Sequence, residues 1–174
     1  MRLQFVSPLL HELDRLEAEV LLGVLWQDVR PADGIAGLCD FRLGGRLSRW
    51  MLEGYLTGAV GEALLVPGKP AFGFEKLLFV GAGARATFDD ARFEQVLATM
   101  LKHVDGLATR SVVAELPGRQ GDVVTPEHAA DRLLAALAAP KAKQASWTVV
   151  EELPARRRIE QQLVEERRRL RPVL

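Results

Sequence analysis

Two glycine-bearing turns, each directly after a short apolar run, constrain the fold of this chain most. The first run, Glu19–Gln27, is almost continuously apolar and too short for a core helix, which is typical of a strand buried on both faces. The turn Asp33–Gly37 follows it, and the turn Leu116–Gly121 follows a second run, Ser111–Glu115. Both turns lead into helical patterns, and backbone N–H groups at such junctions are suited to binding anions.

The remaining sequence continues the alternation of strands and helices. Strands are expected at Leu3–Ser7, Glu19–Gln27, Glu62–Val66, Lys76–Val80, Ser111–Leu116 and Ala145–Val150. Helical patterns cover Pro8–Leu16, Gly34–Gly54, Phe88–His103, a segment that starts at Thr125-Pro126, and Pro154–Leu170. The pair Gly44-Gly45 inside the second helical pattern either weakens the prediction of a helix there or marks close packing. The alternation predicts a mixed α/β layer fold.

Composition excludes several classes of protein. The 174 residues fit one domain, and 48% of them are apolar, as in globular chains. The formal net charge is zero, so no global field favours nucleic acid or an anionic membrane. The single cysteine, Cys39, excludes an internal disulfide and suits a reducing compartment. Because no apolar run reaches the roughly 18–20 residues of a membrane span and the start lacks a signal-peptide layout, we expect a soluble, cytoplasmic protein.

Two stretches of the chain resemble a known family. Arg46–Glu62 and Lys76–Gly83 are similar to the N-terminal domain of the leucyl (cytosol) aminopeptidases, and the order of elements over Met1–Leu153 agrees. That domain is itself similar to macro domains, which bind ADP-ribose and related nucleotides. The resemblance implies a macro-domain-like, three-layer α/β fold over residues 1–153, with a mixed sheet and helices on both faces. Residues 154–174 match the linker helix that joins the two domains of those enzymes.

The macro-domain resemblance also implies where a ligand would bind. The first phosphate-binding loop corresponds to Gly34, Ile35, Ala36 and Gly37, the second lies near Gly118, Arg119, Gln120 and Gly121, and Glu19 falls where macro domains place an adenine-reading aspartate. The asparagine-bearing motif that faces the distal ribose is replaced here by Gly23–Trp26, and the bulky Trp26 is able to fill the pocket. This departure argues against nucleotide binding and against ADP-ribose hydrolysis.

The glycine turns also have a purely architectural interpretation. Glycine at a strand-to-helix junction commonly serves backbone geometry or close packing without any ligand. Arg119 keeps the ligand interpretation open, since a guanidinium beside amide donors is able to clamp a phosphate. The alternative places Arg119 on a solvated loop tip.

No residue of the chain is expected to be catalytic, to bind a metal or to need a cofactor. In the aminopeptidases the chemistry belongs to a separate C-terminal domain, where carboxylates and a lysine hold two metal ions, and the present sequence stops where that domain would begin. His11, His103 and His128 are scattered without metal-ligand spacing, and Cys39 has no identifiable partner base. Whether the chain is full length or a fragment is left open.

The C-terminal segment is unusually rich in arginine. Seven arginines lie between Ala155 and Arg171: Arg156, Arg157, Arg158, Arg167, Arg168, Arg169 and Arg171. This pattern fits a solvated helix with internal Glu–Arg pairs, or a basic arm that binds nucleic acid or an acidic partner. No aromatic residues are interleaved, so stacking on single-stranded bases is not supported.

Two functions of different class follow, and we favour the first. The first is a non-catalytic relative of the aminopeptidase N-terminal domain that acts as a protein-interaction, assembly or regulatory module, with a second copy or an aminopeptidase as partner. The alternative is a macro-like binder of ADP-ribose or another phosphorylated small molecule, through the two glycine turns. Nucleic-acid binding through the C-terminal arginines is a third and weaker hypothesis, and no membrane partner is expected.

Overall fold

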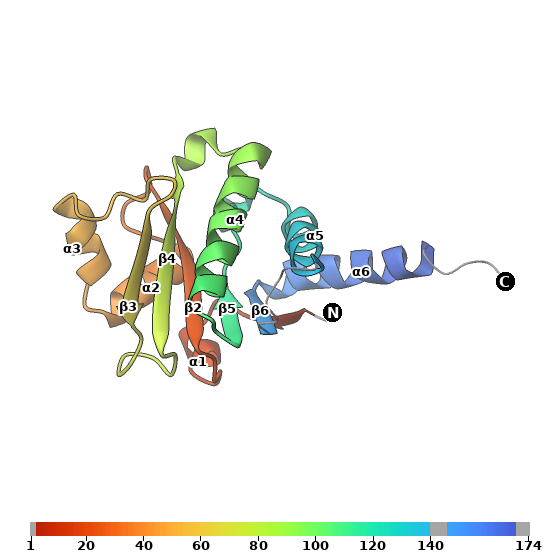
Figure 1. Cartoon of the computed structure of the whole chain (residues 1–174), viewed down its shortest axis with the longest axis horizontal. Coiled ribbons are helices and arrows are strands. Elements are labelled where there is room, and N and C mark those ends of the chain that lie inside the picture. The colour runs from red at the N-terminus through yellow and green to blue at the C-terminus, as the bar shows by residue number, and fades with distance from the viewer. Residues whose placement is uncertain (1–2, 140–145, 170–174) are drawn as a thin grey trace.

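A six-stranded mixed sheet forms the centre of the molecule, with strand order β1-β6-β5-β2-β4-β3 in a computed structural model that describes residues 3–139 and 146–169 (Figure 1). Its strands are β1 (Gln4–Val6), β2 (Val20–Trp26), β3 (Ala63–Pro67), β4 (Lys76–Gly83), β5 (Ser111–Ala114) and β6 (Ser146–Val150). The first five strands in this spatial order pair in parallel, and β3 runs antiparallel to β4 at one edge. The predicted mixed sheet is therefore confirmed.

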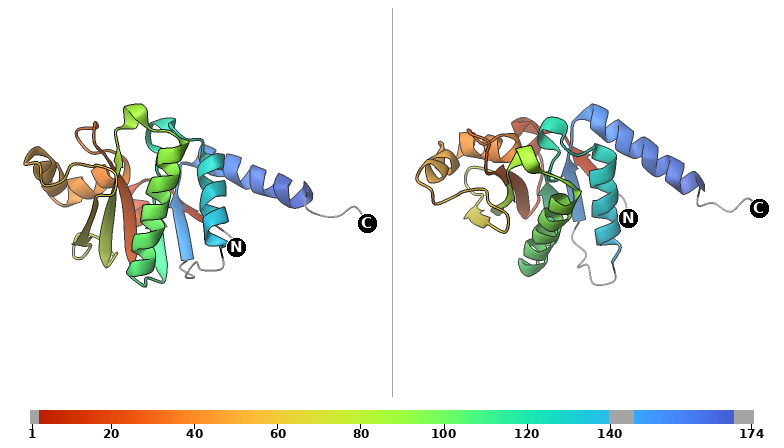
Figure 2. Two further views of the ribbon diagram at one scale, coloured as in Figure 1. Left: turned by 45° about the horizontal axis from the view of Figure 1, so that its top comes forward. Right: turned by 90° about the horizontal axis from the view of Figure 1, so that it is seen from above.

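Helices cover both faces of the sheet, which gives the predicted three layers (Figure 2). The helices are α1 (Leu10–Leu13), α2 (Gly34–Arg42), α3 (Arg46–Leu52), α4 (Asp90–Gly106), α5 (Pro126–Leu137) and α6 (Leu153–Arg169), with 3-10 turns η1 (Arg85–Thr87) and η2 (Gln120–Asp122). One apolar cluster joins the sheet to α4, α5 and Ile159 of α6, and a second joins it to α1, α2 and α3. None of the helices in the described part of the chain is long and apolar enough to cross a membrane.

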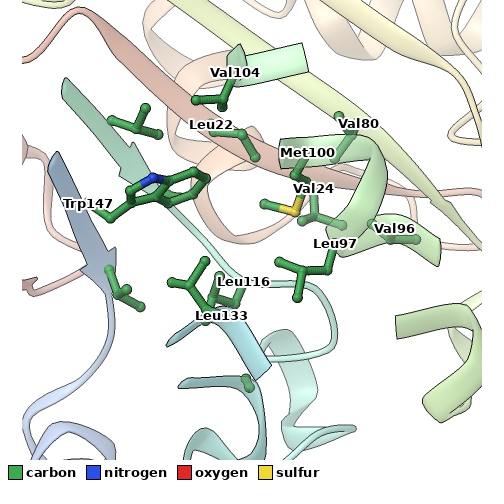
Figure 3. Packing of buried hydrophobic residues seen from close by; sticks show 14 of the residues in the cluster. Leu22, Val24, Val80, Val96, Leu97, Met100, Val104, Leu116, Leu133 and Trp147 are labelled. Carbon is green, nitrogen blue, oxygen red and sulfur yellow. The ribbon is translucent and has the colours of Figure 1, made fainter. Parts of the chain in front are cut away.

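Strand β2 is buried on both faces, as its apolar run predicts. Successive side chains of a strand point to opposite faces. Leu22 and Val24 therefore pack toward α4, against Met100 and Leu97, as Figure 3 shows. Leu21 and Leu25 belong to the opposite cluster beneath α2. This double burial fixes β2 in the middle of the sheet, and it fixes where the turn after β2 emerges.

The helical pattern over Gly34–Gly54 is two helices instead of one. Gly44 and Gly45 between α2 and α3 have φ of +65° and +76°, a left-handed backbone that favours glycine. A Cβ on either glycine would meet nothing within 4 Å, so backbone geometry explains the pair and close packing does not. The buried Asp40 then caps α3, because its Oδ1 accepts hydrogen bonds from the backbone N–H of Leu47 (2.7 Å) and Ser48 (3.1 Å).

The last helix, α6, begins at Leu153 and extends away from the sheet at the end opposite β3 (Figures 1 and 2). Ile159 anchors it in the core, while Val164, further along, is 47% exposed. Arg156 pairs with Glu160 (3.0 Å) within the helix, and Arg158 pairs with Glu127 of α5 (2.6 Å). Leu170, the predicted end of this helix, and Ala145, the predicted start of β6, lie outside the described residues.

Candidate functional site

The two glycine turns lie side by side at the carboxyl edge of the sheet. They follow β2 and β5, which are parallel neighbours with Leu22 opposite Ala114. A cavity of about 350 Å³ opens beside them, between the β5–α5 connection and the start of α6. Of the predicted site residues, the cavity is lined by Gly34, Arg119, Gln120 and Gly121. The structure thus brings both turns to one place, which is the edge where ligands bind in open α/β folds.

Gln120 connects the two turns with its side chain. Its Nε2 donates to the backbone oxygen of Asp33 (3.2 Å) and to Oε2 of Glu115 (2.7 Å), and its Oε1 accepts from Nε1 of Trp26 (2.7 Å). A Cβ built on Gly34 would lie 1.5 Å from Nε2 of Gln120. The amide of Gln120 therefore lies directly over Gly34, and it covers the backbone that the macro-domain resemblance assigns to a phosphate.

Glu115 places a carboxylate at the start of α2. The residue is only 5% exposed, and its Oε1 accepts from the backbone N–H of Ile35 (3.2 Å) at the first turn of that helix. The N-terminus of a helix is where an anion binds best. Burial raises the pKa of Glu115 to about 7, although the hydrogen bonds from Gln120 and Ile35 oppose this shift. A side chain of the protein thus occupies the position that the resemblance assigns to a ligand phosphate.

Arg119 is neither a free phosphate clamp nor a solvated loop residue. Its side chain is 7% exposed and forms an ion pair with Glu151, whose side chain is 5% exposed. The guanidinium also donates to Oδ1 of Asp122 (3.1 Å) and to the backbone oxygen of Val124. Burial raises the pKa of Glu151 above its ordinary value, and the neighbouring Arg119 opposes that shift. The expectation of a solvated Arg119 is therefore wrong, because this side chain joins the turn to the end of β6.

Arg85 also belongs to this network, although it is not among the site residues predicted from the sequence. Its Nη2 donates to Oδ2 of Asp33 (2.7 Å) and to Oε1 of Gln120 (3.2 Å). The guanidinium lies 5.0 Å from the ring centre of Trp26, which in turn packs edge-to-face on Phe88 at 4.9 Å. Trp26 therefore fills space at the end of β2. The available signal was that Arg85 follows the predicted strand Lys76–Val80 by five residues; in the structure β4, the neighbour of β2, ends at Gly83, two residues before Arg85.

Glu19 does not join the glycine turns. It precedes β2, whereas Gly34 follows that strand, so the two lie at opposite ends of it. The Glu19 carboxylate accepts from Oγ1 of Thr109 (2.9 Å) and from the backbone N–H of Arg110 (3.2 Å). The hydrogen bond from Thr109, followed by that from Arg110, lowers the pKa of Glu19 below its ordinary value. The structure gives this residue a role in joining β2 to the start of β5.

The other predicted loop residues serve packing. Ile35 and Ala36, in the first turn of α2, are fully buried. A Cβ on Gly37 would lie 2.6 Å from the backbone oxygen of Ala32, and one on Gly118 would lie 2.5 Å from Cγ2 of Val124. Close approach therefore accounts for both glycines, in agreement with the architectural interpretation.

The candidate metal and nucleophile residues remain separate from this site. Across residues 3–139 and 146–169, no group of three or more histidine, cysteine, aspartate or glutamate side chains is arranged to hold a metal ion. Cys39 is fully buried in α2, and burial raises the pKa of its thiol to about 12. A thiol of that kind is a packing residue.

Relatives in sequence are cytosol aminopeptidases. The family model described as "Cytosol aminopeptidase family, N-terminal domain" matches residues 24–152. A cytosol aminopeptidase of Pseudomonas aeruginosa is 32% identical over 98 residues, which are 55% of this chain and 19% of the enzyme. A probable cytosol aminopeptidase of Haemophilus ducreyi is 26% identical over 104 residues, 60% of this chain and 21% of the relative. The chain thus spans about a fifth of the length of these curated relatives.

Relatives in structure are macrodomains and a leucine aminopeptidase. The macrodomain of Mycobacterium tuberculosis DarG superposes with a TM-score of 0.64 at 18% identity, over 84% of this chain and 97% of that one. A Trypanosoma brucei macrodomain in complex with ADP superposes with a TM-score of 0.67 at 12% identity, over 92% of this chain and 67% of that one. A tomato leucine aminopeptidase variant superposes with a TM-score of 0.58 at 12% identity, over 91% of this chain and 35% of that one. With its macrodomain-like α/β fold, this chain belongs to the cytosol aminopeptidase family, whose N-terminal domain it matches.

Proposed function

We propose that this chain is a non-catalytic interaction module of the cytosol aminopeptidase family, which acts through contacts with protein and does not bind nucleotides. The observation that carries the proposal is the internal carboxylate of Glu115 at the start of α2, with Gln120 lying over Gly34. Glu115 accepts from the backbone N–H of Ile35, which a phosphate would otherwise use, and Gln120 fills the space over Gly34. The fold is similar to that of a macrodomain solved in complex with ADP, so the proposal rests on the side chains at the site and not on the fold.

Electrostatics support the same conclusion. The cavity is lined by four acidic residues and two arginines: Glu115, Asp122, Glu151, Glu152, Arg119 and Arg158. Both arginines are already paired, Arg119 with Glu151 and Arg158 with Glu127. Turning Arg119 toward a ligand would leave the buried Glu151 without its partner, which is costly. A phosphorylated ligand would therefore meet net negative charge and no free cation from these two residues.

The outer surface offers apolar side chains for protein contacts. Three large residues of the α2–α3 region are strongly exposed: Phe41 (78%), Leu52 (86%) and Tyr55 (80%). Exposed apolar side chains that gather in one region mark protein–protein contacts more often than isolated ones do. The non-catalytic part of the proposal is supported by the family match, which falls on the N-terminal domain.

The test is an isothermal titration of the folded chain with ADP-ribose, and separately with ADP, at moderate salt. We expect no saturable heat with either nucleotide. The variant Glu115→Gln removes the carboxylate but keeps the side chain's shape, and we expect it to stay silent because Gln120 still covers Gly34. One-site binding to the wild type in the micromolar range or tighter, about −8 kcal/mol, would overturn the proposal and support the ADP-ribose alternative.

A further inference from the structure

The segment Gly118–Val124, here called the strap, contacts the start of α6 through one side chain and the closed site through the next. We propose that the strap couples these two regions. When it lifts Gln120 away from Gly34, it also draws Arg119 away from its acidic partner and loosens the first turn of α6. This coupling rests on the proposed function, in which the chain's own side chains close the site, and it is a means of regulating that closure.

The side chain of Gln120 attaches the strap to the closed site. It donates to the backbone oxygen of Asp33 (3.2 Å) and to Glu115 (2.7 Å). It also accepts from the indole N–H of Trp26 (2.7 Å). A Cβ on Gly34 would meet the same amide at 1.5 Å. The site therefore stays closed only while the strap keeps Gln120 in this position.

The side chain of Arg119 attaches the strap to the start of α6. It forms an ion pair with Glu151, and both side chains are buried. Within the described residues, this pair is the only hydrogen-bonded link between the strap and residues 150–169. The cavity of about 350 Å³ lies between the rest of the strap and α6, where Gly121 and Ala155 line it. One pair of side chains therefore bridges an otherwise open space.

Internal hydrogen bonds make the strap move as one piece. The backbone N–H of Val124 donates to the backbone oxygen of Gly118 (2.8 Å), which joins the two ends of the strap. The guanidinium of Arg119 donates to the backbone oxygen of Val124 and to Oδ1 of Asp122 (3.1 Å). Because the guanidinium is bound to the strap itself, it moves with the strap and does not remain beside Glu151.

The backbone of the strap needs both attachments to keep its shape. Asp122 has a φ of +52°, a left-handed conformation that is uncommon for a residue other than glycine. Strain of this kind persists only where the surrounding contacts enforce it. Arg119 supplies such contacts on one side of the strap, and Gln120 supplies them on the other. Loss of either attachment therefore favours relaxation of the strap, which weakens the other attachment.

The start of α6 depends on the ion pair because Glu151 stands two residues before the helix. A buried carboxylate that loses its cation is strongly destabilised, so Glu151 without Arg119 favours a conformation that reaches water. Further along, Ile159 is buried and Arg158 pairs with Glu127 of α5, which keeps the rest of the helix in place. Coupling between two sites is reciprocal, so a partner that turns the start of α6 also opens the site.

Amide hydrogen exchange measured by NMR tests the coupling, because each side of the strap has a reporter. The backbone N–H of Ile35 donates to Glu115 in the closed site (3.2 Å). The backbone N–H of Arg156 donates to the backbone oxygen of Glu152 at the first turn of α6 (3.0 Å). The amide of the buried Leu97, inside α4, reports global unfolding. Exchange of a hydrogen-bonded amide requires that its bond opens, so the three rates separate local from global opening.

The variant Glu151→Gln weakens the ion pair from the α6 side and leaves every residue of α2 unchanged. We expect the N–H of Ile35 to exchange about tenfold faster than in wild type, after normalisation to Leu97. The N–H of Arg156 should also exchange faster. A purely local role of Glu151 predicts no change at Ile35.

The matched control is Glu127→Gln, which weakens the other ion pair that holds α6 to the domain, that of Arg158. The control leaves Arg119 and Glu151 unchanged. We expect faster exchange in α6, with the rate at Ile35 within about twofold of wild type, since the strap keeps both of its attachments.

The variant Gln120→Ala tests the coupling from the side of the site. It removes the amide that lies over Gly34. We expect about fivefold faster exchange at Arg156, although Gln120 forms no hydrogen bond with α6 within the part of the chain that the structure describes. This variant also tests the coupling if Glu151→Gln does not fold.

Each result bears on one proposal at a time. No change at Ile35 in Glu151→Gln, or an equal change in the control, overturns the coupling. Unchanged exchange at Arg156 in Gln120→Ala overturns it as well, and so does acceleration of the α4 amide by the same factor as the reporters. All of these results leave the nucleotide titration unaffected, whereas saturable ADP-ribose binding overturns the proposed function even where the coupling is observed.

Discussion

The carboxyl edge of the sheet and the β3 edge differ in how completely their polar groups are satisfied. Between β2 and β5, Gln120 and Glu115 provide partners for Trp26 and for the backbone of Ile35. At β3, by contrast, alternate backbone groups face outward beside an exposed Leu65. The first region resembles the interior of a folded protein, and the second is an open edge of the sheet. The fold is similar to one solved in complex with ADP, and open α/β sheets bind ligands at the carboxyl ends of their strands, but in this chain side chains of the protein lie at that edge.

The largest effect is expected from breaking the buried ion pair of the closed site. Arg119→Ala leaves Glu151 buried without its partner, and removal of one member of such a pair costs about 3–5 kcal/mol of unfolding free energy. Urea unfolding of the variant measures this loss. Arg132→Ala is the control, because Arg132 and Glu94 are each 44% exposed and such surface pairs contribute about 0–1 kcal/mol. Equal losses in the two variants would mean that Arg119 does not hold the closed site together.

The next largest effect is a change of the unfolding free energy with pH. Glu115 ionises near its ordinary pKa of 4.5 in the unfolded chain and at about 7 in the folded protein, so the folded state binds this proton more tightly between those values. The unfolding free energy therefore falls as pH rises through this interval, by at most about 1.4 kcal/mol per pH unit. Glu115→Gln removes the contribution.

The comparison needs unfolding curves for wild type and Glu115→Gln from pH 5 to pH 8. We expect the stability of the variant, relative to wild type, to increase as pH rises. Other groups with shifted pKa values, such as Glu151 and Glu19, remain in both proteins and cancel in the difference. A difference that stays constant with pH would mean that Glu115 is ionised in the folded protein throughout, as in an open and hydrated site.

A smaller effect on the unfolding free energy distinguishes a steric clash at Gly34 from the backbone strain of a positive φ. Gly34 and Gly44 both have positive φ, +56° and +65°, so alanine at either position costs about 1–2 kcal/mol of strain. At Gly34 the new Cβ also meets Gln120 and Glu115, whereas at Gly44 it meets nothing within 4 Å. Displacing those side chains adds about 1–3 kcal/mol, typical of overpacking. Urea unfolding of Gly34→Ala and Gly44→Ala should show this excess, and equal costs would contradict the closure of Gln120 over Gly34.

Much of the fold was predictable because it depends on local patterns. The double burial of β2 follows from its continuous apolar run. The start of α5 follows from Thr125 and Pro126, since Oγ1 of Thr125 accepts from the backbone N–H of His128 (3.4 Å). The break between α2 and α3 was marked by Gly44 and Gly45, but the helical spacing of apolar residues continues across it. The left-handed backbone conformation of the two glycines separates α2 from α3, and the sequence does not encode that conformation directly.

The state of the site was less predictable because it depends on distant partners. Sequence placed Arg119 in a turn, but its burial depends on Glu151, which is 32 positions away. Arg85 joins Asp33 across 52 positions, through the neighbouring position of β2 and β4 in the sheet. Glu19 was assigned to the site by the macro-domain resemblance alone, but it precedes β2 and therefore lies at the other end of that strand from Gly34. Turn chemistry is local, whereas the closure of a site is a tertiary property.

The smallest effect on the unfolding free energy is expected from substitution of an exposed apolar residue of α3. Leu52 is 86% exposed at the end of α3, so Leu52→Ser removes little buried surface and should change the unfolding free energy by less than about 0.5 kcal/mol. Leu47 on the same helix is fully buried, and Leu47→Ala should cost about 2–5 kcal/mol. Urea unfolding of both variants measures the contrast. A loss above 1 kcal/mol for Leu52→Ser at high protein concentration, absent on dilution, would mean that Leu52 is buried between copies.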